Sequence, residues 1–151
     1  MHNQPRSLLL AAGLLVAAIC VNAQQGPQPK LPTVQLTAGM HVIQAELAVS
    51  SAEQSVGMMG RTEMGANEGM LFVNQDSATR CFWMKNTLVP LTIAFIAEDG
   101  TIINLADMQA RSEQAHCSTK PARYALEMRQ GWFAKRNLKA GMQLRGGPFQ
   151  K

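Results

Sequence analysis

The sequence predicts a mainly β protein: a small, single-domain antiparallel β sandwich or barrel with one or two short helices. Residues 42–49 alternate with a period of two, which is the pattern of a half-buried strand. Asp99-Gly100 separates two apolar, β-rich runs, and this dipeptide is typical of a tight hairpin turn. The remaining apolar runs are short and are separated by glycine, proline or polar residues, which favours several short strands.

The individual elements follow from similar signals. A hairpin is expected at the N-terminal end of the domain, with strands at 34–36 and 41–49 and its turn at 37–39. Ser51 and Gln54 form a capping-box pattern, which predicts a short helix that ends before Gly57 and Gly60. Pro90 predicts a bend or a strand at a sheet edge. Other expected elements are strands at 70–73, 82–84, 93–97, 101–105, 124–128 and 142–144, a turn at 74–79, a loop at 110–121 and one helical turn at 132–137.

The first residues predict export. Arg6 precedes an apolar run, residues 8–21, that is too short to span a bilayer, and a small-residue cleavage pattern follows at residues 21–23. We therefore expect a signal peptide at 1–23 and a periplasmic or secreted protein with no stable membrane anchor after cleavage. The alternative is a lipoprotein signal that uses Cys20, and bulky Ile19 argues against it.

Cleavage leaves residues 24–151, enough for one hydrophobic core. Residues 24–32 are polar and proline-rich and are expected to form a flexible linker, and residues 33–151 form the single domain. The 13 cationic and 10 acidic side chains of this region are dispersed, so we expect no nucleic-acid partner. The expected state is a monomer with an unidentified small-molecule or envelope partner.

Two cysteines remain after processing, Cys81 and Cys117. In an oxidising compartment an isolated pair most often forms a structural disulfide, and we expect one here. The alternative is a pair of thiols that act as metal ligands or redox groups. A catalytic pair formed by Cys117 and His116 is disfavoured, because adjacent residues of a strand point in opposite directions and no orienting partner is evident.

Several motifs occur in an order that matches a known family: Gly57 to Arg61, Gly69 to Phe72, Phe82 to Thr87 with Pro90-Leu91, Asp99-Gly100, and Tyr124 to Glu127 ahead of Gly131. With these elements the chain resembles the family called domain of unknown function 192 over residues 42–144. The resemblance implies a mainly β, often exported domain and implies no activity. One position departs from the family: Thr92 stands where an aspartate is usual, so any catalytic or metal-binding role of that acid would be missing.

Polar residues that interrupt apolar runs suggest a ligand-binding cleft. Arg61 and Lys85 would hold an anionic or hydroxyl-rich ligand, and neighbouring side chains would supply hydrogen bonds. The structural alternative is a buried salt bridge from Arg61 to Glu127, with Asn86 and Thr87 satisfying backbone groups near the proline bend. The candidate ligand-binding residues are Arg61, Trp83, Lys85, Asn86, Thr87 and Glu127.

Our leading hypothesis is therefore a non-catalytic, exported binding or accessory domain without a cofactor or metal. A second hypothesis is a periplasmic copper-binding protein that uses His116, the two cysteines and the clustered methionines Met58, Met59, Met64 and Met70. The simpler interpretation is that these methionines fill gaps in a small core. A third hypothesis is an enzyme acting on envelope glycans or peptides, although no phosphate loop, CxxC, HExxH or nucleophile elbow is present.

Overall fold

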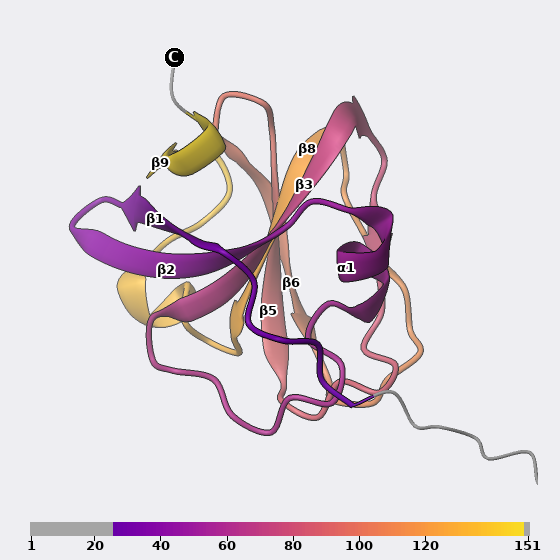
Figure 1. Cartoon of the computed structure of the whole chain (residues 1–151). Helices are drawn as coiled ribbons and strands as arrows, with labels where there is room; N and C mark the ends of the chain where they lie inside the picture. Colours follow the sequence, from indigo (N-terminus) through magenta and orange to yellow (C-terminus); the bar gives the residue numbers. More distant parts are fainter. Residues whose placement is uncertain (1–25, 150–151) are drawn as a thin grey trace, which may run out of the picture.

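The computed structural model describes residues 26–149, so the predicted signal peptide at 1–23 lies outside the described range. The described chain forms a curved seven-stranded sheet, a two-stranded ribbon, a short α-helix and two 3₁₀ helices (Figure 1). The prediction of a mainly β domain with few, short helices is confirmed. Within residues 26–149, no helix is both long enough and apolar enough to cross a bilayer.

The sheet has the strand order β6-β5-β8-β3-β2-β1-β9. All neighbouring pairs are antiparallel except β2 and β3, which are parallel. A parallel pair needs a crossover connection, and here helix α1 with the loop after it provides this connection. The strands are β1 (Thr33–Ala38), β2 (His41–Ala48), β3 (Glu68–Ala78), β5 (Leu91–Ile96), β6 (Ile102–Met108), β8 (Ala122–Arg129) and β9 (Leu144–Gly146), and the helix is α1 (Ser51–Val56).

The central strands β5 and β8 are covered on both faces. All six residues of β5 are buried, which explains why this strand reads as a nearly continuous apolar run. One face packs Ile96 and Leu126 against aromatic residues of the C-terminal segment 132–149. The opposite face packs Ile93 and Phe95 against residues of the crossover loop and of segment 82–89. The core therefore consists of two apolar clusters with the sheet between them.

The capping box of helix α1 starts at Ser50, one residue before the predicted Ser51. Ser50 Oγ accepts a hydrogen bond from Glu53 N at 3.2 Å, and Glu53 Oε2 accepts one from Ser50 N at 2.7 Å. The predicted pair of Ser51 and Gln54 is wrong because the sequence contains two overlapping patterns of the same kind. Gln54 Nε2 instead donates to the carbonyls of Ala48 and residue 73, which connects α1 to β2 and β3.

Strand β3 is longer than its apolar pattern predicts. The turn expected at 74–79 is wrong, because β3 continues to Ala78, which pairs with Ala122 of β8. The register shifts between Val73 and Ala78, so this polar part of the strand contains a bulge. Asn74 Nδ2 donates to the Arg123 carbonyl at 3.0 Å, and strand pairing thus overrides the turn-like composition.

The hairpin predicted at Asp99-Gly100 is present between β5 and β6. Gly100 has φ +88°, and a side chain there would also collide with the Leu144 carbonyl. The N-terminal hairpin is present as well, with a two-residue turn at 39–40 in place of the predicted 37–39. Strand β9 is shifted by two residues from the expected 142–144. The one predicted helical turn near the C-terminus is the 3₁₀ helix Ala134–Arg136.

The described part of the predicted flexible linker, residues 26–32, has no regular structure but contacts the domain. Gln28 Nε2 donates to the carbonyls of Glu53 and Gly57 at 3.0 and 2.9 Å. Leu31 N donates to Glu46 Oε2 at 2.8 Å, and the Leu31 side chain packs against the core. The composition predicts a flexible linker, whereas these contacts hold the described part of this segment against the domain.

The disulfide between Cys81 and Cys117 is present, as predicted, with a Cα–Cα distance of 4.0 Å. It joins the two short strands of the ribbon, β4 (Cys81–Phe82) and β7 (His116–Cys117), which pair only with each other. Two-residue strands provide few hydrogen bonds, so the covalent bond is the main link within the ribbon.

Replacing both cysteines by serine should lower the free energy of unfolding by about 3–4 kcal/mol. The bridge joins residues 36 positions apart, and this closed loop restricts the conformational entropy of the unfolded chain. Urea denaturation of the oxidised wild type and of the Cys81→Ser/Cys117→Ser variant measures the difference. A reducing agent should lower the wild type to the stability of the variant and leave the variant unchanged. Equal stabilities of the oxidised wild type and the variant would contradict this account.

Candidate functional site

A cleft of about 360 Å³ lies between α1, the three residues after it, the β4 strand of the ribbon and the central sheet. Its polar rim comes from α1 and from the bulged end of β3, and its inner surface comes from buried residues of β3 and β8. The lining residues are Ser51, Gln54, Ser55, Val56, Gly57, Met58, Met59, Phe72, Asn74, Arg80, Cys81, Phe82, Trp83, Thr87 and Glu127.

Glu127 is the unusual group in this cleft. It lies on β8 between Met70 of β3 and Ile93 of β5, its cross-strand neighbours on the same face of the sheet. The residue is only 4% exposed, and no described residue forms a hydrogen bond or an ion pair with its carboxyl group. Its oxygen atoms are not among the fully buried, unpartnered polar atoms of the described residues, so the carboxyl group keeps some accessible surface, which faces the cleft.

Burial alone raises the pKa of Glu127 to about 8, since removal from water disfavours the charged form. The group is therefore mainly a neutral carboxylic acid at pH 7. In this form it has one O–H donor and retains acceptor capacity, whereas a carboxylate can only accept.

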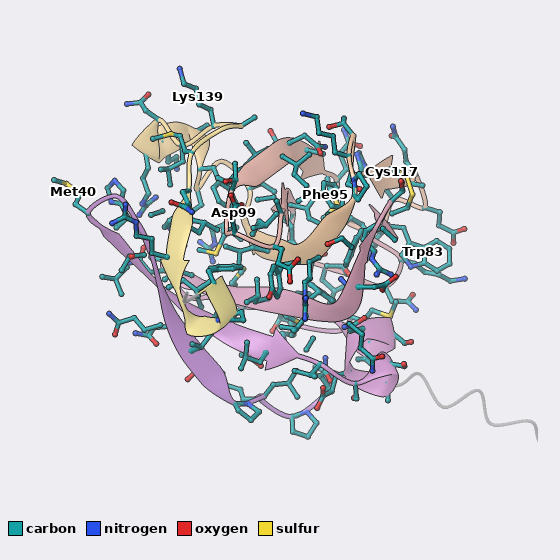
Figure 2. The ribbon with its side chains drawn as sticks, turned by 90° about the horizontal axis from the view of Figure 1, so that it is seen from above. Met40, Trp83, Phe95, Asp99, Cys117 and Lys139 are labelled. Atoms are coloured by element: carbon teal, nitrogen blue, oxygen red, sulfur yellow. A yellow bond between two sulfur atoms is a disulfide. The ribbon has the colours of Figure 1, made fainter. Side chains whose placement is uncertain are left out.

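Aromatic side chains form one wall of the cleft. Phe82 packs edge-to-face against Phe72 at 4.8 Å between ring centroids and against Phe95 at 5.9 Å. Trp83, the next residue along, is 48% exposed and extends outward from the same end of the domain as Cys117, whereas Phe95 lies inside (Figure 2). The disulfide holds this aromatic segment against β7 and thereby positions the wall.

Arg61 does not form the predicted salt bridge with Glu127. Its two terminal nitrogens instead bind both oxygens of Glu46, at 2.6 and 2.7 Å. Glu46, Met70 and Glu127 stand opposite one another on β2, β3 and β8, so Met70 separates the two acids by two strand spacings, about 9–10 Å. Arg61 is thus a largely buried structural residue and does not line the cleft.

The predicted polar cluster 85–87 divides between the surface and the cleft. Lys85 points to solvent, 3.9 Å from Glu113 and 5.2 Å from the Trp83 ring centroid. Asn86 has φ +57°, a conformation that asparagine tolerates, and its carbonyl accepts from Gly60 N at 2.9 Å. Thr87 is buried and lines the cleft. The structure thus brings Trp83, Thr87 and Glu127 of the predicted site together, and it places Arg61, Lys85 and Asn86 outside the lining.

Thr92, where the family usually has an aspartate, faces away from the cleft. It stands opposite Met128 on β8, one position from Glu127, and therefore on the other face of the sheet. Its hydroxyl donates to Asp107 Oδ1 at 2.5 Å and accepts from Gly131 N at 3.0 Å. The departure from the family pattern consequently leaves the cleft unchanged.

Most of the methionines that the copper hypothesis invokes lie in the core. Met58, Met64 and Met70 are buried in the apolar cluster beneath α1, in keeping with the gap-filling interpretation. Cys117 is bonded to Cys81, so neither sulfur atom is a free thiolate for a metal or for a catalytic pair with His116. The described residues contain no group of three or more His, Cys, Asp or Glu side chains suited to a metal ion.

Several lining residues were not predicted. Phe72 was assigned to the core, and Asn74 and Arg80 fall in or beside the segment predicted as a turn. The bulge in β3 and the crossover by α1 bring these residues to Glu127, which is about 50 residues away in the sequence. No local pattern signals such a long-range arrangement. Glu46 had a weaker signal, an acid within an alternating strand.

Comparison with known families decides the classification. The model of the DUF192 family, described as an uncharacterized ACR, matches residues 34–146. The chain belongs to the DUF192 family. Several residues of the motifs by which the chain resembles this family line the cleft: residues 57–59, Phe72, residues 82–83 and Glu127. No curated protein matches the sequence.

Two solved structures show the same DUF192-like fold. A candidate transcription regulator from Sinorhizobium meliloti is 33% identical, with a TM-score of 0.72, over 77% of this chain and 93% of that chain. A protein of unknown function from Novosphingobium aromaticivorans is 35% identical, with a TM-score of 0.70, over 75% of this chain and 83% of that chain. These matches cover most of both structures and support the fold described above.

The stability of the domain should fall as the pH rises through the range in which Glu127 is neutral in the folded state and ionised in the unfolded state. Below about pH 4.5 both states are protonated, and above about pH 8 both are ionised, so this contribution has no slope there. In between, the folded state binds more protons, and the free energy of unfolding should decrease by up to about 1.4 kcal/mol per pH unit.

Urea denaturation at several pH values between 5 and 8 measures this slope. Glu127→Gln should remove its contribution, because the amide does not titrate. Identical pH profiles for the wild type and the variant would show that the Glu127 carboxyl is ionised in the folded protein.

Proposed function

We propose that this DUF192 protein is an exported, periplasmic domain that binds a small ligand in the cleft beneath α1 and does not itself catalyse a reaction. The observation that carries the proposal is Glu127, a buried carboxyl group that lines the cleft and has no partner among the described residues. A ligand polar atom would supply the missing hydrogen bond.

The contrast between the two buried acids of the sheet supports a binding role. Glu46 is satisfied by the Arg61 guanidinium and by Leu31 N. Glu127, in the same row of cross-strand neighbours, borders open space. The volume of the cleft lies near the lower end of the range for small-molecule sites, roughly 300–1,000 Å³.

A binding role is favoured over hydrolysis by the composition of the lining. Among the lining residues Glu127 is the one carboxyl group, and the one cysteine, Cys81, is in a disulfide. Standard glycoside hydrolysis uses two carboxyl groups on opposite sides of the bond that is cleaved. Nucleophilic catalysis needs an activated nucleophile beside a base. Neither arrangement is present in this lining.

Export is supported by the N-terminal sequence and by the disulfide. Residues 1–23 have the charge, length and cleavage pattern of a signal peptide. Disulfides persist in oxidising compartments such as the periplasm. A role in transcription, as suggested for the Sinorhizobium relative, is not part of this proposal, because the cationic side chains are dispersed and nucleic-acid binding needs a concentrated basic surface.

At least one of three probe compounds should bind in the cleft: N-acetylglucosamine (uncharged), benzylamine (cationic) or benzoate (anionic). Saturation-transfer NMR detects binding, and chemical shifts of the Trp83 indole locate it. Ser55→Trp should block the cleft, since this exposed serine lies on its rim. Ala52→Trp, on the same helix outside the lining, is the matched control and should bind normally. Failure of all three compounds, or equal binding by both variants, would contradict the proposal.

The protein exported to the bacterial periplasm should lack residues 1–23 and contain the oxidised disulfide. Intact-mass spectrometry before and after reduction and thiol labelling measures both properties. The expected mass corresponds to residues 24–151, with two thiols labelled only after reduction. A full-length chain, or a lipid-modified chain beginning at Cys20, would contradict this part of the proposal.

A further inference from the structure

We infer that the ligand of the cleft is uncharged and rich in hydroxyl groups, with a sugar ring stacked on Trp83 and hydrogen bonded by the carboxyl group of Glu127. This inference rests on the proposed binding function and assigns its ligand class. Three features of the cleft support it: the balance of charge, the aromatic wall and the supply of neutral polar groups.

The cleft presents no uncompensated charge to a ligand. Arg80 is the one cationic residue of the lining, and its Nη2 donates to both the side chain and the carbonyl of Asp76, at 2.5 and 2.9 Å. Glu127 is neutral at pH 7. A cationic ligand would have to displace the Glu127 proton, and an anionic ligand would have to share the Arg80 guanidinium with the Asp76 carboxylate, through a donor such as Nε that has no partner among the described residues. An uncharged ligand requires neither change.

The charged groups around Glu127 are occupied elsewhere. On α1, Glu53 accepts from the Val49 and Ser50 amides. On the crossover loop, Arg61 is paired with Glu46. The neighbouring strands β3 and β5 contribute apolar side chains at the positions opposite Glu127. Burial is consequently the sole cause of the pKa shift of Glu127, and its protonation can serve as an isolated reporter of ligand binding.

Trp83 supplies a large flat surface at the mouth of the cleft. Its side chain is half exposed although it adjoins the partly buried Phe82, and its one ring contact among the described residues is with Lys85 Nζ, 5.2 Å from the ring centroid, which leaves the other face of the indole open. The face of a pyranose ring that carries C–H bonds is apolar, so it can pack on an indole ring while its hydroxyl groups remain free to form hydrogen bonds.

Neutral polar groups surround the space between Trp83 and Glu127. Ser51, Ser55 and Thr87 contribute hydroxyl groups to the lining, and Ser55 Oγ donates to the Ser51 carbonyl at 2.7 Å, so it remains an acceptor for a ligand. Asn74 donates through Nδ2 to a backbone carbonyl, so its amide oxygen remains an acceptor. A set of hydroxyl, amide and carboxylic acid groups has the mixed donor and acceptor character that recognises sugar hydroxyls.

N-acetylglucosamine should bind the wild-type protein more tightly at pH 7 than at pH 9, by about tenfold in association constant. A carboxyl group with a pKa of about 8 is about nine-tenths protonated at pH 7 and about one-tenth at pH 9. Isothermal titration calorimetry measures the binding. Glu127→Gln keeps a neutral donor and acceptor and should bind with little change between the two pH values. Trp83→Ala should weaken binding roughly three- to tenfold at both pH values, through loss of the aromatic contact.

The other probes distinguish failure of this inference from failure of the proposed function. Benzylamine that binds in the cleft, more tightly at pH 9 than at pH 7, with no binding of N-acetylglucosamine, would overturn the ligand class and retain the binding function. Benzoate binding alone would lead to the same conclusion. Absence of binding by all three probes would overturn both proposals. Sugar binding with no pH dependence would exclude Glu127 as its hydrogen-bond donor.

Discussion

The structure depends on the burial of both faces of its central strands. β5 and β8 lie in the middle of a curved sheet, and each face needs an apolar cover that the strands themselves cannot provide. The C-terminal segment 132–149 covers one face, and the crossover loop with segment 82–89 covers the other. The irregular segments that cover the sheet are therefore a structural requirement, and the cleft lies where the second cover meets β3 and β8 beside α1.

Buried acids on such a sheet must be paired or remain neutral, and this domain contains one of each kind. Glu46 and Glu127 belong to the same row of cross-strand neighbours, with Met70 between them. Arg61 neutralises Glu46 with two hydrogen bonds, which holds the crossover loop against β2. Glu127 lines the cleft and has no such partner among the described residues. Burial therefore acts on it alone and raises its pKa to about 8. Glu46 lies within reach of Arg61 and has a structural role, whereas Glu127 lies beyond its reach and is the candidate functional acid.

Much of the fold was predictable from local patterns. The Asp99-Gly100 hairpin, the apolar strands and the disulfide all have short-range or compositional signals, and all are present. The errors lie where tertiary pairing overrides composition, as in the polar half of β3, or where two capping patterns overlap at the start of α1. Half of the predicted site residues, Trp83, Thr87 and Glu127, line the cleft. The others have structural or surface roles that depend on partners distant in sequence.

The sequence by itself determined the β class, the family, the cysteine pair and the presence of polar residues inside an apolar framework. Periodicity, turn residues and motif order are local properties, so they can be read before folding. Only the tertiary structure decided which acid Arg61 neutralises, which face Thr92 occupies and where open space remains beside Glu127. These outcomes depend on strand register and on the parallel β2–β3 pairing, which bring residues far apart in the chain into contact and which no local pattern specifies.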